Sequence, residues 1–266
     1  MQKKFTRNRA IEIMKELKNL KYFQNPAHRK KYIRNQSGRI ALSFNLIRNS
    51  LNKDSAVLDL GIAPYFFAHL IKSQYNCKIY GIGLSASGAE EMEENFGFPT
   101  YYCNIEIDKF PFEDSTFDIV VCTEVLEHLV MNPSHTLSEI HRVLKSRGIL
   151  LISTPNAVSL TNRFALLFGR NIFAKYSLDH IYGRHNRLFT RRELKKLLKD
   201  SNYEIEKCIM FTDTTPFKKR IAKLFALVGS LVSPNLRDKI IILARKFGET
   251  KMAFPESVYR HSLKTD

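Results

Sequence analysis

The stretch Val57-Leu58-Asp59-Leu60-Gly61-Ile62-Ala63-Pro64 decides the fold of this 266-residue chain. An apolar run ends in Asp-x-Gly and apolar residues at helical spacing follow it, so the sequence predicts a strand, a tight turn and a helix. Ligands of open parallel sheets bind at the carboxyl ends of the strands, beside the amino ends of the following helices. The turn at Gly61 is therefore the first candidate for a ligand-binding site.

Short apolar runs alternate with helical stretches after this motif. Helices are predicted up to about residue 73, from residue 85, and near 134–144; further strands are predicted at 78–83, 100–105, 117–124 and 148–154. Strands that alternate with helices need crossover connections, which place the helices on both faces of a parallel sheet. The sequence therefore predicts an α/β core with a mostly parallel central sheet.

Three parts are predicted along the chain. Residues 1–53 form a basic segment with helices at 6–22 and 37–51, residues 54–211 form the core, and residues 212–266 form a basic helical extension. Within the core, residues 156–190 lack a regular period and are predicted to form a lid or insertion. A helix at 191–200 and a strand at 203–211 follow it.

The extension holds two basic amphipathic stretches, residues 217–232 and 236–247, and a last strand around 257–263. The first stretch, with four cations before an apolar run, has two interpretations. It docks on an anionic bilayer, in which case the substrate is a lipid or a lipid-linked glycan. Alternatively, the two stretches form a helix pair that packs on the core with its basic face in water.

The net charge of +16 is unevenly distributed. Lys and Arg outnumber Asp and Glu by 14 to 2 in residues 1–53 and by 22 to 10 in residues 156–266, whereas residues 54–155 hold 6 cations and 14 acids. Two basic flanks favour an anionic partner, such as nucleic acid, a phosphorylated metabolite or an anionic membrane surface. Solvated helix faces are the alternative explanation.

Composition also bears on localisation. The longest apolar run, residues 224–233, is shorter than a transmembrane helix requires. The first 20 residues lack the apolar stretch of a secretory signal, and the four cysteines show no zinc-ligand or paired spacing. We therefore expect a cytoplasmic protein with no transmembrane segment, with peripheral attachment to a membrane surface as an alternative.

The motifs in order are VLDLGIAP, YGIGLS, CNIE, FPFEDSTFDIVVCTEVLEHL and HRVLKSRGILLISTPN. In this order and at these spacings they resemble the class I S-adenosylmethionine-dependent methyltransferases, over roughly residues 54–211. The resemblance implies a Rossmann-like fold and S-adenosylmethionine as the cofactor.

The resemblance also implies roles for individual residues. The turn with Gly61, Ala63 and Pro64 would pack against the methionine part of the cofactor, and Asp59 would order that turn. The end of the second strand, with Gly83 and Ser85, would hold the ribose. Asn104 and Ile105 would flank the adenine; an ordinary core position is the alternative for Ile105.

The chain departs from the family pattern at three places. Gly61-Ile62-Ala63-Pro64-Tyr65 stands where relatives read Gly-x-Gly-Pro-Gly, Gly83 stands where an acid binds the ribose hydroxyls, and Asn104 stands where an Asp is common. Losing a charge-assisted bidentate contact costs on the order of 1.5–3 kcal/mol. Ser85 or an acid among residues 90–94 is a candidate substitute, and a solvated helix face is the alternative for those acids. A methyltransferase fold that has lost catalysis and serves as a binding or scaffold protein is the rival interpretation.

Glu124, Glu127 and His128 follow the fourth strand at i, i+3 and i+4, so they share one face of a helical turn. With His185, from the segment before the late helix, they are predicted to lie near the acceptor. Carboxylate and imidazole ligands together suit Mg²⁺ or Mn²⁺. This pattern resembles the small-RNA 3′-terminal 2′-O-methyltransferases and the O-methyltransferases of ubiquinone biosynthesis. Alternatively, Glu124 lines the cofactor pocket and His128 packs the turn.

The sequence therefore predicts an S-adenosylmethionine-dependent methyltransferase that acts on oxygen of an unidentified acceptor, either a small molecule, a glycan or a lipid-linked compound. The acceptor is expected to be anionic or membrane-associated. An RNA 2′-O-methyltransferase is the alternative enzyme, which the charge pattern and the histidines favour. His141 is predicted to be structural, and His180 is a weaker candidate for the site.

Overall fold

The computed structural model describes residues 4–17, 25–83, 93–94, 97–173, 175, 184–212 and 233–259. Within these residues one seven-stranded sheet has the order β3-β2-β1-β4-β5-β7-β6. The strands are β1 (Ala56–Leu60), β2 (Lys78–Gly83), β3 (Thr100–Tyr102), β4 (Phe117–Thr123), β5 (Leu144–Pro155), β6 (Tyr203–Phe211) and β7 (Lys239–Lys246). Strands β1 to β5 pair in parallel, and β7 runs antiparallel between β5 and β6.

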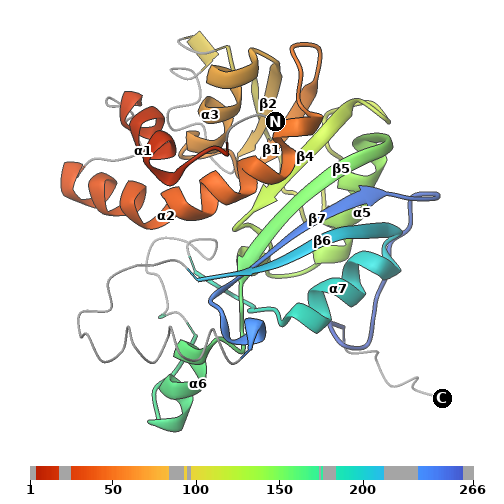
Figure 1. Ribbon diagram of the computed structural model, residues 1–266. Coiled ribbons are helices and arrows are strands. Elements are labelled where there is room, and N and C mark those ends of the chain that lie inside the picture. The colour runs from red at the N-terminus through yellow and green to blue at the C-terminus, as the bar shows by residue number, and fades with distance from the viewer. Residues whose placement is uncertain are drawn as a thin grey trace, which may run out of the picture.

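Helices cover both faces of the sheet (Figure 1). One face carries α1 (Arg7–Glu16), α2 (Pro26–Ile47) and α3 (Phe66–Tyr75), and the other carries α5 (Pro133–Val143) and α7 (Arg191–Asp200). Helix α6 (Leu160–Leu167) follows β5, and the short 3₁₀ helices are η1 (Arg48–Ser50), η2 (Leu126–His128) and η4 (Pro234–Leu236). The Rossmann-like α/β prediction, with helices on both faces of a mostly parallel sheet, is confirmed.

Side-chain alternation along the strands builds two apolar cores. In β1, for example, Val57 packs into the core beneath α1, α2 and α3, and Leu58 packs into the core beneath α5 and α7. Both residues are 0% exposed. Because both faces are covered, the central strands are almost continuously apolar, as parallel sheets require.

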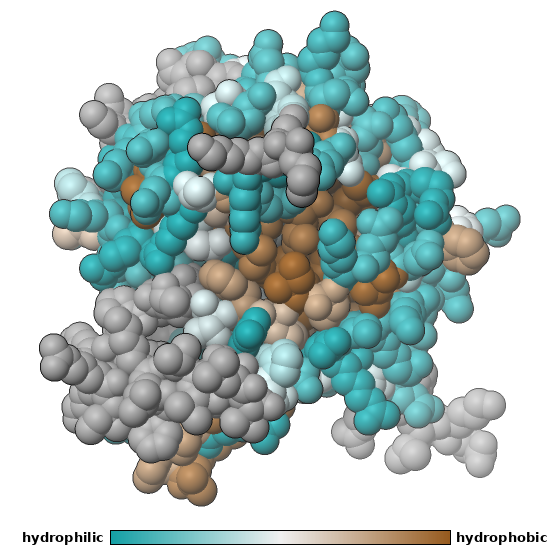
Figure 2. Space-filling model, in the orientation of Figure 1, coloured by the Kyte–Doolittle hydropathy of each residue, from teal (hydrophilic) through white to brown (hydrophobic). Residues whose placement is uncertain are grey.

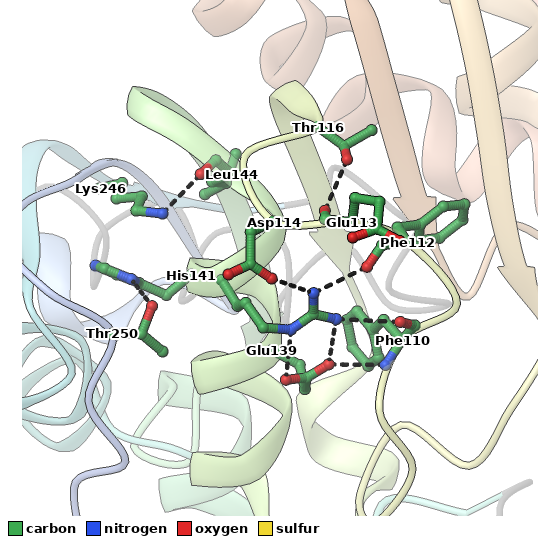
Figure 3. Close-up of polar contacts among 11 residues, drawn as sticks. Phe110, Phe112, Glu113, Asp114, Thr116, Glu139, His141, Leu144, Lys246 and Thr250 are labelled. Carbon is green, nitrogen blue, oxygen red and sulfur yellow. Dashed lines mark hydrogen bonds and ion pairs between the residues drawn. The ribbon is translucent and has the colours of Figure 1, made fainter.

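Arg142, on α5, fastens that helix to the loop before β4 (Figure 3). Its guanidinium donates to both carboxylate oxygens of Glu139, at 2.9 and 2.7 Å, and to Oδ1 of Asp114 at 2.8 Å. It also donates to the carbonyls of Phe112 and Phe110, at 2.8 and 3.1 Å. Glu139 in turn accepts from the backbone N–H of Phe110. This network sets the position of β4, at whose far end the candidate site lies.

The prediction that residues 212–266 form a helical extension is wrong for one stretch. Residues 236–247 were expected to be a basic amphipathic stretch, yet Lys239–Lys246 form strand β7 in the middle of the antiparallel part of the sheet. Its Ile240, Ile241 and Ile242 are each 0% exposed, because a central strand is buried on both faces. The sheet therefore extends beyond the predicted boundary at residue 211.

Other boundaries differ less. The second helix begins at Pro26, with Asn25 as its N-cap, and not at residue 37. The segment 156–190, expected to lack a period, contains α6. Residues 257–259 are not a strand, and the rest of the predicted last strand lies outside the described residues, as do stretch 217–232 and residues 85–92 of the predicted helix. Among the described helices, none has the length and apolar character needed to cross a membrane.

Candidate active site

The turn after β1 lies at the carboxyl end of the sheet and has a constrained backbone. Gly61 has φ +68°, and its N–H and that of Ile62 both donate to the carbonyl of Ile82, at 2.9 and 3.2 Å. A Cβ on Gly61 would lie 2.8 Å from Cγ2 of Val125, which follows β4. Glycine is therefore needed here both for its φ angle and for the close approach of β4. Ala63 and Pro64 complete the turn before α3.

Asp59, in β1, is 4% exposed. Burial raises the pKa of its carboxyl to about 7, although the positive charge of Arg39 acts in the opposite direction. The backbone N–H groups of Gly61 and Ile62 in this turn are held by the carbonyl of Ile82, and the role of Asp59 in ordering the turn stays a prediction. Arg39 lies on α2 and is itself 4% exposed, so a buried cation reaches the sheet at this point.

The residues predicted to flank the ribose and adenine are placed as follows. Gly83 ends β2 and pairs with Tyr102, whereas Ser85 lies outside the described residues. Asn104 accepts through Oδ1 from the N–H of Glu106, at 3.1 Å, and so braces its own turn. Ile105 is 7% exposed and packs in the core beneath α5. The ribose and adenine roles of these residues stay predictions.

Glu124 follows the last residue of β4 and has φ +59°. Its Oε1 accepts from Oγ of Ser153, at 3.1 Å, and its Oε2 forms an ion pair with Nζ of Lys239, from β7. Burial opposes ionisation of this carboxyl, but Lys239 and Arg39 outweigh it and hold its pKa well below the ordinary value. Arg39 also donates to Oγ of Ser153, at 3.5 Å. Glu124 is thus a fixed anion between two cations.

Glu127 lies one turn further on, in η2, and is 0% exposed. Its Oε2 accepts from Oγ1 of Thr154, at 3.2 Å, while its Oε1 is buried without a hydrogen-bond partner among the described residues. Burial, and then the charge of Glu124, raise the pKa of Glu127. An unpaired buried carboxylate oxygen costs free energy, so a ligand that takes it up would be favoured.

His128 and His185 complete this cluster. One ligand atom from each of Glu127, His128 and His185 can be chosen so that all lie within 4.8 Å of one another, and the two imidazole rings meet edge to face with centroids 5.0 Å apart. Nδ1 of His128 lies 2.9 Å from the carbonyl of Arg184, which can only accept. Nδ1 therefore carries the proton, and Nε2 of the neutral ring has its lone pair available.

The segment around His185 is fastened to η2 by further bonds. The N–H of Asn186 donates to the carbonyl of Glu127, at 2.7 Å, and its side-chain amide donates to the carbonyl of His128, also at 2.7 Å. Burial lowers the pKa of His185, and His128 and Lys239 lower it further. The structure thus joins three of the four predicted residues into one cluster, while Glu124 is engaged by Ser153 and Lys239.

Four polar side chains of this region were missed by the sequence analysis: Arg39, Ser153, Thr154 and Lys239. Arg39 stands within an apolar helical stretch, which was the one available signal for it. Lys239 could not be found, because its segment was assigned to a helix. The structural role predicted for His141 is confirmed: it is buried, and its ring nitrogens contact Oγ1 of Thr250 and the carbonyl of Phe247, at 3.0 and 3.1 Å. His180 lies outside the described residues.

A family model for a methyltransferase domain matches residues 32–207, from within α2 into β6. The chain belongs to the class I S-adenosylmethionine-dependent methyltransferases. The match includes the Gly61 turn, Glu124 and the Glu127, His128 and His185 cluster. The candidate site of this methyltransferase therefore lies within the matched residues, at the carboxyl ends of the parallel strands, among buried charged side chains.

Curated relatives agree with this assignment, and a solved structure shares the fold. A probable S-adenosylmethionine-dependent methyltransferase of Mycolicibacterium smegmatis is 31% identical over 98 residues, covering 37% of this chain and 33% of the relative. The ubiquinone biosynthesis O-methyltransferase of Rickettsia typhi is 26% identical over 162 residues, covering 56% and 60%. The chain spans about half the length of the curated relatives it matches. The structure of geranyl diphosphate methyltransferase in complex with GPP and sinefungin superposes with a TM-score of 0.57 at 16% identity, over 80% of this chain and 78% of that one.

Proposed function

We propose that this methyltransferase transfers the methyl group of S-adenosylmethionine to a hydroxyl oxygen of its acceptor, and that Glu127, His128 and His185 hold a divalent cation beside that hydroxyl. The proposal is carried by the cluster itself: a carboxylate oxygen of Glu127 lies within 4.8 Å of a ring nitrogen of each of two histidines, and Oε1 of the same carboxyl is buried without a hydrogen-bond partner among the described residues. Carboxylate and imidazole donors together suit Mn²⁺ or Mg²⁺.

The relationship to the Rickettsia typhi protein supports oxygen as the acceptor atom, since that relative is an O-methyltransferase of ubiquinone biosynthesis. The shared fold alone does not identify the acceptor atom, because the geranyl diphosphate enzyme has the same architecture and a different acceptor. Support for a hydroxyl acceptor therefore comes from the Rickettsia typhi relative and from the cluster of Glu127, His128 and His185.

Each part of the site has a role in this proposal. The cofactor lies over the turn of Gly61, Ala63 and Pro64, with Asp59, Gly83, Ser85, Asn104 and Ile105 along its length. Transfer from a sulfonium needs alignment of the nucleophile, the methyl group and the leaving sulfur, together with exclusion of water. Glu124, held between two cations, places a fixed negative charge at the end of β4. A bound divalent cation would supply positive charge that favours ionisation of the acceptor hydroxyl.

Calorimetry with S-adenosylmethionine and S-adenosylhomocysteine tests the cofactor part of the proposal. We expect saturable binding of both, abolished by a bulky substitution in the turn such as Ala63→Trp.

A methyl-transfer assay with labelled cofactor and a panel of hydroxyl acceptors then tests the metal part. Turnover should stop in chelator and return with Mn²⁺ or Mg²⁺. Full activity in chelator would reject the metal, and absence of cofactor binding to folded protein would favour the scaffold interpretation.

A further inference from the structure

Helix α6 ends in an exposed apolar tip. It leaves the carboxyl end of β5, and at its own end Leu166, Leu167 and Phe168 are 57%, 75% and 73% exposed. Figure 1 shows α6 projecting away from the sheet, and Figure 2 shows apolar atoms at that lower tip of the molecule. Adjacent large apolar side chains on a surface mark an interaction site more often than chance exposure.

A strongly basic groove lies beside the first turn of α6, which contributes Arg163 to its lining. It has a volume of about 670 Å³ and is lined by α7, by the residues around α6 and by η4. Its charged lining consists of six cations and one acid: Arg163, Arg191, Arg192, Lys195, Lys196, Lys199 and Asp200. Asp200 is paired with Lys196, at 2.9 Å, so it neutralises little of the remaining charge.

The cations of α7 form a stripe that folding alone does not explain. Arg191, Lys195 and Lys199 recur at i and i+4, where like charges destabilise a helix. Among the described residues, no carboxylate lies within 4 Å of any of these three cations. The opposite face of α7 packs in the core through Leu194 and Leu197. The stripe therefore faces a groove that is suited to anions.

We propose that the α6 tip and the basic groove together dock the protein on an anionic lipid bilayer. Leu167 and Phe168 would enter the interface with the acyl chains, and the stripe of α7 would lie among the phosphates of the headgroups. An apolar tip beside a cationic groove complements such a surface, whereas the phosphodiesters of RNA would use the cations alone. This docking deepens the proposed function and rests on it for its purpose: β5, which precedes α6, carries Ser153 and Thr154 of the site, so an acceptor borne by the bilayer would reach the site from this edge.

Vesicle binding of the full chain tests the surface without any need for turnover. We expect the protein to bind vesicles of phosphatidylcholine with phosphatidylglycerol about tenfold or more tightly than vesicles of phosphatidylcholine alone, and to dissociate as salt increases. Leu167→Glu with Phe168→Glu should weaken binding by about tenfold or more. Lys195→Glu with Lys199→Glu should weaken it by about thirtyfold or more, since loss of each cation near an anionic surface removes a factor of about five and the two new carboxylates are repelled by the headgroups.

Matched controls come from the loops before β1 and after β7, at the end of the sheet opposite to α6. Lys53→Glu with Lys251→Glu changes the net charge equally, and Phe247→Glu with Met252→Glu removes two exposed apolar side chains, 61% and 41% exposed. Both controls should bind vesicles like the wild type. Wild-type binding that neither test variant reduces more than its control, or no vesicle binding at all, would overturn the proposal.

A homopolymer RNA provides the remaining outcome. RNA binding that Lys195→Glu with Lys199→Glu abolishes, in a protein that does not bind vesicles, would assign the groove to nucleic acid and overturn bilayer docking. Calorimetry with S-adenosylmethionine separates the two proposals. Cofactor binding without vesicle binding rejects only the docking surface, and vesicle binding without cofactor binding rejects only the proposed function.

Discussion

Lys239, on β7, forms an ion pair with Glu124, at the end of β4, although strand β5 lies between these two strands. The two side chains are only 18% and 17% exposed. The pair therefore connects the antiparallel part of the sheet to the carboxyl end of β4. Removing one partner of such a pair leaves the other charge buried and uncompensated.

We predict that Lys239→Met lowers the free energy of unfolding by about 3 kcal/mol, because Glu124 loses its main counter-charge. Glu124→Gln with Lys239→Met should cost less than the sum of the two single changes, as expected for residues that interact directly. Urea unfolding of the four proteins measures both values. Lys145→Met is the matched control, since Lys145 pairs with Asp118 at a more exposed place and should cost under about 1 kcal/mol. Equal losses in the two lysine variants would contradict the prediction.

Gly61 and Gly97 provide a second matched comparison, because both have positive φ angles, +68° and +64°. A Cβ on Gly97 meets nothing within 4 Å, so Gly97→Ala should cost only the backbone strain, about 1–2 kcal/mol. Gly61→Ala adds a clash with Val125 and should cost more, and it should weaken S-adenosylmethionine binding about tenfold or more. Thermal unfolding and calorimetry check this. Cofactor binding weakened equally in both variants would show that the turn is not specific to the site.

The order of the fold up to β5 could be predicted from the sequence because each strand there is a short apolar run bounded by a turn, as in β1 and β4. Strand β7 could not, since Lys239, Arg245 and Lys246 flank its apolar residues and resemble the polar face of a helix. A central antiparallel strand with charged ends shows no alternation of apolar and polar residues by which it could be identified. Only its pairing with β5 and β6 identifies it.

The candidate site divides in the same way. Glu127 and His128 are neighbours in sequence, so their spacing predicted a shared face, and the structure brings His185 to them. Arg39 comes from α2 and Lys239 from β7, and no sequence spacing relates either residue to Glu124. Long-range pairs of this kind depend on tertiary packing, and no spacing between residues in the sequence predicts them.

Arg142→Lys should lower the free energy of unfolding by about 2–3 kcal/mol. Lysine retains the charge but lacks the planar fork that bonds Glu139 and Asp114 together with two backbone carbonyls. Arg147→Lys is the control, because Arg147 pairs with Glu204 where both side chains are more than half exposed, 58% and 57%. That change should cost less than about 0.5 kcal/mol. Chemical denaturation at neutral pH distinguishes the two, and similar values would refute the structural role of the network.

Asp59 should make stability depend on pH in the cofactor-free protein. Its pKa is raised from 3.8 to about 7 by burial, so the unfolded chain releases this proton at lower pH than the folded protein does. The contribution of Asp59 to the free energy of unfolding is thus constant below about pH 4, falls as pH rises from 4 to 7, and is constant again above 7. Asp59→Asn removes this pH-dependent contribution. The free energy of unfolding of the variant should therefore rise relative to that of the wild type between pH 4 and 7, by up to about 4 kcal/mol. A difference between the two proteins that does not vary with pH would contradict burial of a protonated carboxyl.

The cluster of Glu127, His128 and His185 should bind Mn²⁺ in the absence of cofactor and acceptor. We predict that His185→Ala and Glu127→Gln each weaken Mn²⁺ binding about tenfold or more, because each removes one ligand from the set. His135→Ala is the matched control, since His135, on α5, contacts the carbonyl of Asp108 and lies outside the cluster. Glu127→Gln should change the free energy of unfolding by no more than about 1 kcal/mol, since Oε1 has no hydrogen bond to lose among the described residues and Oε2 can be replaced by the amide oxygen. Titration of Mn²⁺ by electron paramagnetic resonance measures the affinity, and urea unfolding measures the stability. Mn²⁺ binding that both ligand variants leave intact would show that these three residues only hydrogen-bond, whereas loss of binding with unchanged stability would show that Glu127 is buried there for the ion.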